Sequence, residues 1–190
     1  MSMSLQTKWD AIYSQREGEA TAATVLIENQ HLLPSSGNAL DLACGMGGNA
    51  KLLAKSGLDV VAWDLSSVAI ARLQLEAKNQ KLAIDAQVQD VIDNPPEAQS
   101  LDVLVVSFFL DRELCATLID ALKPGGVLFY QTHCRDKVSQ TGPSNPDYLL
   151  ADNELLSLFS GLKLRVYREE SVLGDHQQGF RNQAFLVAEK

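Results

Sequence analysis

The sequence contains few cysteines, few aromatic residues and a deficit of positive charge. Of its 190 residues, three are Cys, 6% are aromatic, and 16 Lys and Arg stand against 24 Asp and Glu, which gives a net charge of −8. A surface that follows phosphates needs a stripe of Lys and Arg, so this balance disfavours a nucleic-acid partner. The cysteines, Cys44, Cys115 and Cys134, form no C-x-x-C pair. We therefore expect reduced thiols, with neither a metal site nor a disulfide framework.

Long apolar runs are missing as well. No stretch approaches the ~18 apolar residues that span a membrane, and residues 1–6 lack the apolar core of a signal peptide. These absences predict a cytoplasmic protein with no membrane partner. Apolar residues make up 46% of the chain and charged residues 21%, as in ordinary globular proteins. The length suits a single α/β domain over residues 1–190.

The most informative stretch is residues 40–50. An apolar run carries one acid, Asp41, and then breaks into a turn with Gly45, Gly47 and Gly48, after which a helical pattern begins. This order predicts a strand, a tight loop and a helix. Glycines allow positive φ and leave no Cβ between the backbone and a ligand. Open α/β sheets bind their ligands at such loops, beyond the carboxyl end of a strand.

The acid in this stretch indicates the kind of ligand. Gly45-x-Gly47-x-x-Ala50 fits the dinucleotide pattern, which is a weak signal alone. A carboxylate at Asp41 repels a pyrophosphate but attracts the ammonium group of a cationic amino acid. The ligand that fits is nucleoside-like, free of phosphate and positively charged. S-adenosylmethionine has these properties.

Strand and helix patterns alternate along most of the chain, which predicts an α/β fold with a mostly parallel sheet. Asp64 ends the second expected strand, 19 positions after Gly45, close to the ~20-residue offset of a carboxylate that binds ribose hydroxyls. The last two expected strands are joined without a helix, so they should be antiparallel. The expected strands are 39–43, 58–63, 83–89, 101–106, 127–132, 162–168 and 181–188. The expected helices are 5–16, 21–33, 49–56, one capped by Ser66, 112–122 and 152–159.

Several of these motifs together are similar to a known family. The turn at 41–48, Asp64 followed by Ser66, Asp90 after the third strand, and Leu-Lys-Pro-Gly-Gly at 122–126 resemble class I S-adenosylmethionine-dependent methyltransferases. The resemblance implies a Rossmann-like sheet of seven strands in the order 3-2-1-4-5-7-6. Its last strand is expected to be antiparallel, and helices are expected on both faces.

The resemblance also implies a cofactor site. The groups expected to hold the methionine moiety are Asp41 and the backbone of Gly45, Gly47 and Gly48. Asp64 is expected to bind both ribose hydroxyls, Leu65 to pack on the adenine, and Asp90 to accept from the adenine amino group. The remaining cofactor contacts are assigned to Val91 and Ser107.

A narrower resemblance concerns the ends of the chain. Trp9-Asp10-x-x-Tyr13 and Gly142-Pro143-x-Asn145-Pro146 are similar to tellurite-resistance and small-thiol methyltransferases. This branch implies a small, soft or anionic acceptor, such as a thiol or an oxyanion of tellurium or selenium, with S-adenosylhomocysteine as the second product. The helices of residues 1–35 are expected to cover the cofactor, and the polar loop 133–148 is a candidate lid. The assembly is expected to be a monomer or a homodimer.

The acceptor side offers residues whose roles stay open. The candidate catalytic residues are His133, His176 and Arg181, and the candidate pocket residues are Trp9, Tyr13, Phe108 and Arg135. Ordinary packing explains the aromatic residues equally well, and solvated surface positions explain the charged ones.

Three other functions remain open. One is a cofactor-binding sensor or partner subunit without turnover, and a second is a methyltransferase acting on a protein. A nicotinamide oxidoreductase is the third, and Asp41 disfavours it.

Overall fold

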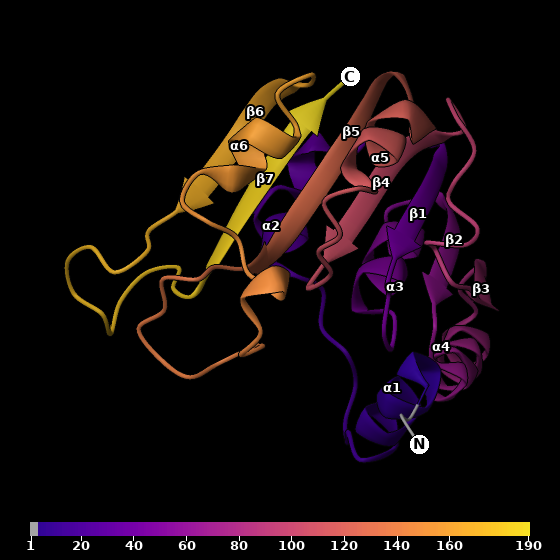
Figure 1. The fold of residues 1–190 in the computed structure, drawn as a ribbon. Helices are drawn as coiled ribbons and strands as arrows, with labels where there is room; N and C mark the ends of the chain where they lie inside the picture. Colours follow the sequence, from indigo (N-terminus) through magenta and orange to yellow (C-terminus); the bar gives the residue numbers. More distant parts are fainter. Residues whose placement is uncertain (1–3) are drawn as a thin grey trace.

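The computed structural model describes residues 4–190; residues 1–3, the start of the segment expected to contain no signal peptide, lie outside this range. The described chain forms one seven-stranded sheet in the order β3-β2-β1-β4-β5-β7-β6 (Figure 1). β7 runs antiparallel to β5 and β6, and the other pairings are parallel. The expected fold class and strand order are confirmed. The strands are β1 Asn38–Leu42, β2 Asp59–Asp64, β3 Ile84–Val88, β4 Leu101–Ser107, β5 Leu122–His133, β6 Lys163–Glu169 and β7 Gln183–Glu189.

Helices pack on both faces of this sheet, as Figure 1 shows. One face carries α2, α3 and α4, whose Leu26, Leu53 and Leu73 are fully buried. The other face carries α5 and α6, which bury Leu118 and Leu155. α1 packs on α4. The helices are α1 Leu5–Ser14, α2 Thr24–Glu28, α3 Gly48–Lys55, α4 Ser67–Gln80, α5 Cys115–Ala121 and α6 Glu154–Leu158, with 3-10 turns η1 Gln30–Leu32 and η2 Pro146–Tyr148.

The connection between β3 and β4 differs from the other parallel connections. The chain passes through α3 between β1 and β2, through α4 between β2 and β3, and through α5 between β4 and β5, whereas residues 89–100 contain only turns. Within residues 4–190, the α5–α6 face of the sheet is therefore covered by helices over β4 to β7 and lacks one over β1 to β3.

Three expected elements differ in the structure. The single helix expected over 21–33 is wrong: α2 ends at Glu28, because the side chain of Asn29 donates to the Val25 carbonyl, and η1 follows. The helix expected from Arg112 starts at Cys115, because the Asp111 carboxylate accepts from the amides of Glu113 and Leu114 and so forms a turn before the helix. β5 begins at Leu122, five residues before the expected start, since Leu122 pairs with Leu101 across an irregularity in the register.

Over residues 4–190, no helix combines the length and the apolar composition that crossing a bilayer requires. Within the same part of the chain, no group of three or more His, Cys, Asp or Glu is placed to hold a metal ion.

Candidate active site

The glycine-rich turn is fixed from behind by Asp41. Its side chain is fully buried in β1 and accepts from Asn49 Nδ2 at 3.2 Å and from the Ala50 amide at 2.9 Å. Burial raises the pKa of this carboxyl to about 7, although these two hydrogen bonds oppose the rise. Asp41 therefore joins the end of β1 to the first turn of α3 and holds the loop between them in one shape.

The turn is covered tightly on its outer side. Gly45 and Gly47 have φ of 54° and 73°, in the left-handed region that glycine tolerates best. A Cβ at Gly48 would lie 2.1 Å from the Thr21 carbonyl oxygen, and one at Gly45 would lie 2.8 Å from the Tyr13 hydroxyl. Glycine at these two positions is what allows α1 and residues 21–22 to approach the loop.

Asp64 is the second buried carboxylate of the site. It ends β2, accepts from the Gly45 amide at 2.8 Å through Oδ2, and accepts from the Ser66 amide at 2.8 Å through Oδ1. Burial raises its pKa, and the two amides oppose the rise. A carboxylate has about four acceptor positions, so two remain for a pair of hydroxyls. These two acceptor positions fit the ribose hydroxyls of S-adenosylmethionine.

The neighbouring strand end lies beside Asp64. The Gln89 amide donates to the Asp64 carbonyl at 3.0 Å, which places Asp90 next to this site. Asp90 accepts from the Ile92 amide through one carboxylate oxygen. Leu65 is half-buried, and the side chain of Val91 belongs to the core under α5.

Two candidates for the acceptor side, Phe108 and His133, lie where β4 and β5 end. Phe108, directly after β4, has φ of 58°, is 49% exposed, and donates its amide to the Gln131 carbonyl. Its ring lies 5.1 Å from the imidazole of His133 at 35°. Within residues 4–190, Nδ1 of His133 is buried without a hydrogen-bond partner, and Gly142 of the 133–148 loop packs against this imidazole. Burial, and then the charge of Lys137, lowers the pKa of His133.

Comparison with known proteins agrees with this arrangement. A protein-family model described as a methyltransferase domain matches residues 39–126, from β1 into β5, a span that contains Asp41, Asp64 and Asp90. These residues are similar to a methyltransferase domain, and the site within them fits S-adenosylmethionine as the cofactor. Its fit to that cofactor rests on the buried Asp64 and on the glycine turn, which the Gly45 amide joins to it.

Two curated relatives are similar over part of their length. The chain is 31% identical over 134 residues to a ubiquinone biosynthesis O-methyltransferase of Xanthomonas axonopodis pv. citri (strain 306), covering 65% of this chain and 55% of the relative. It is 38% identical over 96 residues to a demethylmenaquinone methyltransferase of Clavibacter sepedonicus, covering 46% of this chain and 37% of the relative. The chain therefore spans less than two thirds of either relative.

Solved structures show the same fold. TehB from Haemophilus influenzae superposes with a TM-score of 0.74 at 22% identity, covering 96% of this chain and 67% of that one. At this identity the likeness concerns the fold.

Around the glycine turn, two polar side chains that the sequence did not single out, those of Asn49 and Gln131, form hydrogen bonds. Asn49 Nδ2 donates to Ser107 Oγ at 2.9 Å as well as to Asp41, and its Oδ1 accepts from the Ala23 amide at 2.8 Å. The side chain of Gln131 accepts from the Val25 amide at 2.7 Å. The only sequence signal was an amide side chain at the start of α3, directly after the glycines.

Asp10 belongs to the Trp9-Asp10-x-x-Tyr13 motif, but the sequence assigned no contact to it. Its carboxylate accepts from Ser66 Oγ at 2.6 Å and from the Val68 amide at 3.2 Å, which joins α1 to the start of α4. The Ser66 hydroxyl is the main cause of its lowered pKa. Trp9 and Tyr13 stack at 5.9 Å on the same helix, and Tyr13 packs in a small cluster with Met46 and Ala69.

The remaining candidates have partners elsewhere. Arg181 donates to four carbonyls of the β6–β7 connection, those of Glu170, Ser171, Asp175 and Gln178. His176 is exposed in this connection and bonds to the Val172 carbonyl. Arg135 has an exposed side chain, and its amide donates to the Leu150 carbonyl. The hydrogen bonds of His176 and Arg181 hold a loop together and do not bring these side chains to His133.

Proposed function

We propose that the protein transfers the methyl group of S-adenosylmethionine to a small acceptor held where β4 and β5 end. The acceptor is a soft or anionic nucleophile, such as a thiol or a tellurite- or selenite-like oxyanion. The observation that carries the proposal is the pair of buried carboxylates, Asp41 and Asp64, on the two sides of the glycine turn.

The donor side binds S-adenosylmethionine and orients its methyl group. When bound, S-adenosylmethionine supplies a methyl group already activated by a sulfonium centre. Asp64 offers its remaining acceptor positions to the ribose, while Asp90 takes the adenine amino group and Leu65 packs beside the ring. The amides of the glycine turn face the methionine moiety. Transfer from a sulfonium needs an aligned nucleophile and exclusion of water more than a strong base.

The acceptor side positions the nucleophile. The lowered pKa of His133 keeps its imidazole neutral near pH 7, so the ring can accept a proton from a thiol or a hydroxyl. The exposed ring of Phe108 gives the acceptor an apolar surface beside this base. Residues 133–148 then cover the acceptor through Gly142, which touches His133.

A second acceptor class follows from the relatives. The two curated proteins are named for ubiquinone biosynthesis and for demethylmenaquinone. An aromatic acceptor of quinone type can stack on Phe108 and lose a hydroxyl proton to His133. This candidate shares the donor side of the first and differs in the atom that is methylated.

Release of S-adenosylhomocysteine across an acceptor panel tests the proposal. The panel contains tellurite, selenite, small thiols, catechols and a protein extract, with Asp64→Ala as the inactive control and Asp59→Ala, an exposed acid at the start of the same strand, as the matched control. We expect turnover with a thiol or an oxyanion, lost in Asp64→Ala alone.

The other outcomes are equally informative. Turnover with catechols alone favours the quinone-type acceptor. Turnover with the protein extract alone contradicts a small acceptor. Binding of S-adenosylmethionine without turnover on any acceptor favours a sensor, and absence of binding contradicts the cofactor site.

A further inference from the structure

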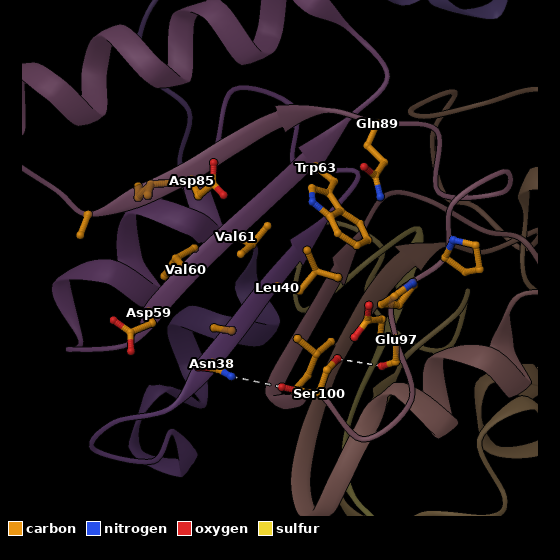
Figure 2. A pocket seen from close by; sticks show the side chains of 16 residues that line it. Asn38, Leu40, Asp59, Val60, Val61, Trp63, Asp85, Gln89, Glu97 and Ser100 are labelled. Carbon is orange, nitrogen blue, oxygen red and sulfur yellow. Dashed lines mark hydrogen bonds between the residues drawn. The ribbon is translucent and has the colours of Figure 1, made fainter.

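The half of the α5–α6 face that lacks a helix contains an open groove of about 930 Å³ (Figure 2). Leu40, Val61 and Trp63 form its floor, and Figure 2 shows these side chains side by side above β1 and β2. Pro95 and Pro96 of the β3–β4 connection line it from the side. The groove is separate from the glycine turn, which lies at the carboxyl ends of the strands.

The dimensions of the floor match one helix. Strands lie ~4.8 Å apart, so β1, β2 and β3 together give a floor roughly 10 Å across, and an α-helix with its side chains is about 10–12 Å wide. Strands of five or six residues are roughly 17–20 Å long, which equals three to four helical turns. Parallel sheets are ordinarily covered by helices on both faces, and residues 4–190 supply none over these strands on this face.

The charge around the groove has one sign. Asp59, Asp85 and Glu97 are exposed acids that line it, and no Lys or Arg is among the lining residues in the described part of the chain. An isologous contact between two copies brings these acids against themselves, and each copy carries a net charge of −8. This arrangement disfavours a homodimer and favours a positively charged occupant.

Trp63 contributes its indole to the same floor. Over residues 4–190 its Nε1 is buried without a hydrogen-bond partner. Because this atom is already covered in the open groove, an occupant meets the apolar face of the indole. The floor is thus apolar, and its rim is acidic.

We propose that this groove binds an amphipathic helix of a partner protein. The helix places apolar side chains on Leu40, Val61 and Trp63 and places Lys or Arg beside Asp59, Asp85 and Glu97. Trp63 directly precedes Asp64, so the bound helix lies next to the strand end that holds the ribose carboxylate.

A synthetic peptide tests the inference. The probe is a 15-residue amphipathic helix of Leu and Lys, and its matched control has Glu in place of each Lys. Trp9 and Trp63 are the two tryptophans of the chain, so a Trp9→Phe background makes the emission report on Trp63 alone. We expect the Lys peptide to shift the Trp63 emission to shorter wavelength and the Glu peptide to leave it unchanged.

Two charge-reversal variants localise the binding. Asp85→Lys with Glu97→Lys changes the rim of the groove, whereas Glu113→Lys with Asp120→Lys makes the same change of net charge at exposed acids outside it. We expect the dissociation constant for the Lys peptide to rise at least tenfold in the first variant and less than twofold in the second. Thermal melts of both variants serve as the control for folding.

Several results overturn the proposal. Equal weakening in the two variants means general attraction to an acidic surface, and an unmoved Trp63 emission means binding elsewhere. A concentration-dependent dimer that buries Trp63 without peptide, seen by sedimentation, means that the occupant is a second copy. Methyl transfer in the Asp85→Lys, Glu97→Lys variant is expected to equal that of the parent, so the proposed activity is tested separately.

Discussion

The donor side and the acceptor side of the site are built differently. On the donor side, Asp41 and Asp64 are buried, and each carboxylate is held by two hydrogen bonds from nearby groups. On the acceptor side, Phe108 is half exposed with a positive φ, and the buried Nδ1 of His133 has no partner within residues 4–190.

Under the proposed function, this difference follows from what each side is expected to bind. A constant ligand allows a site whose hydrogen bonds are formed before binding, because preformed groups lose little entropy when the ligand arrives. Strained backbone and unpaired polar atoms persist where the surrounding structure holds them, and they cluster at sites of function. On the acceptor side, Nδ1 of His133 therefore has no hydrogen-bond partner within residues 4–190, whereas on the donor side the carboxylates already have theirs.

The largest effect is expected at the ribose carboxylate. Asp64→Ala removes two charge-assisted hydrogen bonds to hydroxyls and leaves the amides of Gly45 and Ser66 unpaired. We expect affinity for S-adenosylmethionine to fall about 1,000-fold, measured by calorimetry. Asp59→Ala on the same strand should stay within about twofold, and an equal loss in both variants would contradict the assignment.

The next effect concerns His133. His133→Gln removes the proton acceptor, so kcat with a thiol is expected to fall about 100-fold with unchanged affinity for S-adenosylmethionine. Because the pKa of His133 is lowered, the imidazole is neutral above its usual value of 6.5, and the parent rate should fall only in more acidic solution. A pH–rate profile checks this limb, which must be absent in the variant. An unchanged profile removes His133 from the mechanism.

A third effect concerns the packing of residues 21–22 on the glycine turn, which is measured as stability and without ligand. Gly48→Ala places a Cβ 2.1 Å from the Thr21 carbonyl oxygen, and we expect the free energy of unfolding to fall by about 2–3 kcal/mol. Gly161→Ala is the matched control, because nothing lies within 4 Å of its Cβ position. Urea denaturation of the two variants measures the difference. Equal stability would mean that residues 21–22 do not pack on the turn.

The smallest effect has opposite signs in stability and function. Phe108→Asn places a residue that tolerates positive φ where Phe is strained, so the free energy of unfolding is expected to rise by about 0.5–1 kcal/mol. The same change removes the exposed ring, and KM for the acceptor should rise. Tyr148→Asn, another exposed aromatic residue, should show no gain in thermal stability. A loss of stability in Phe108→Asn would contradict strain at this position.

The arrangement of the donor side could largely be predicted from local sequence motifs. The glycine turn, Asp64 and Asp90 follow their strands directly, so the strand order alone brings them to one edge. The amides that hold Asp64 come from Gly45 and Ser66, both adjacent to predicted strand ends. The groove over β1 to β3 has no local sequence signal of this kind, because it depends on the packing of three strands.

The contacts on the acceptor side could not be predicted from the sequence, because they join distant parts of the chain. Phe108 meets His133 only because β4 pairs with β5, and Gly142 reaches the imidazole through a loop without periodic pattern. Arg181 is a candidate catalytic residue from the sequence, but its donors meet main-chain carbonyls whose positions no side-chain pattern encodes. The break of the expected helix at Asn29 has a different, local origin, since the side chain there bonds to the backbone of its own turn.

The hydrogen bond from the Val25 amide to Gln131 has a consequence for biosynthesis. The two residues are 106 positions apart, and the Gln131 side chain also donates to Gln183 at 2.6 Å. At roughly 5–20 residues per second, the ribosome needs several seconds after releasing Val25 to complete Gln131, and longer to add β7. During this interval the Val25 amide lacks its acceptor, although the Ala23 amide can already bond to Asn49. The last anchor of the segment beside the glycine turn therefore forms only after β5 has been made.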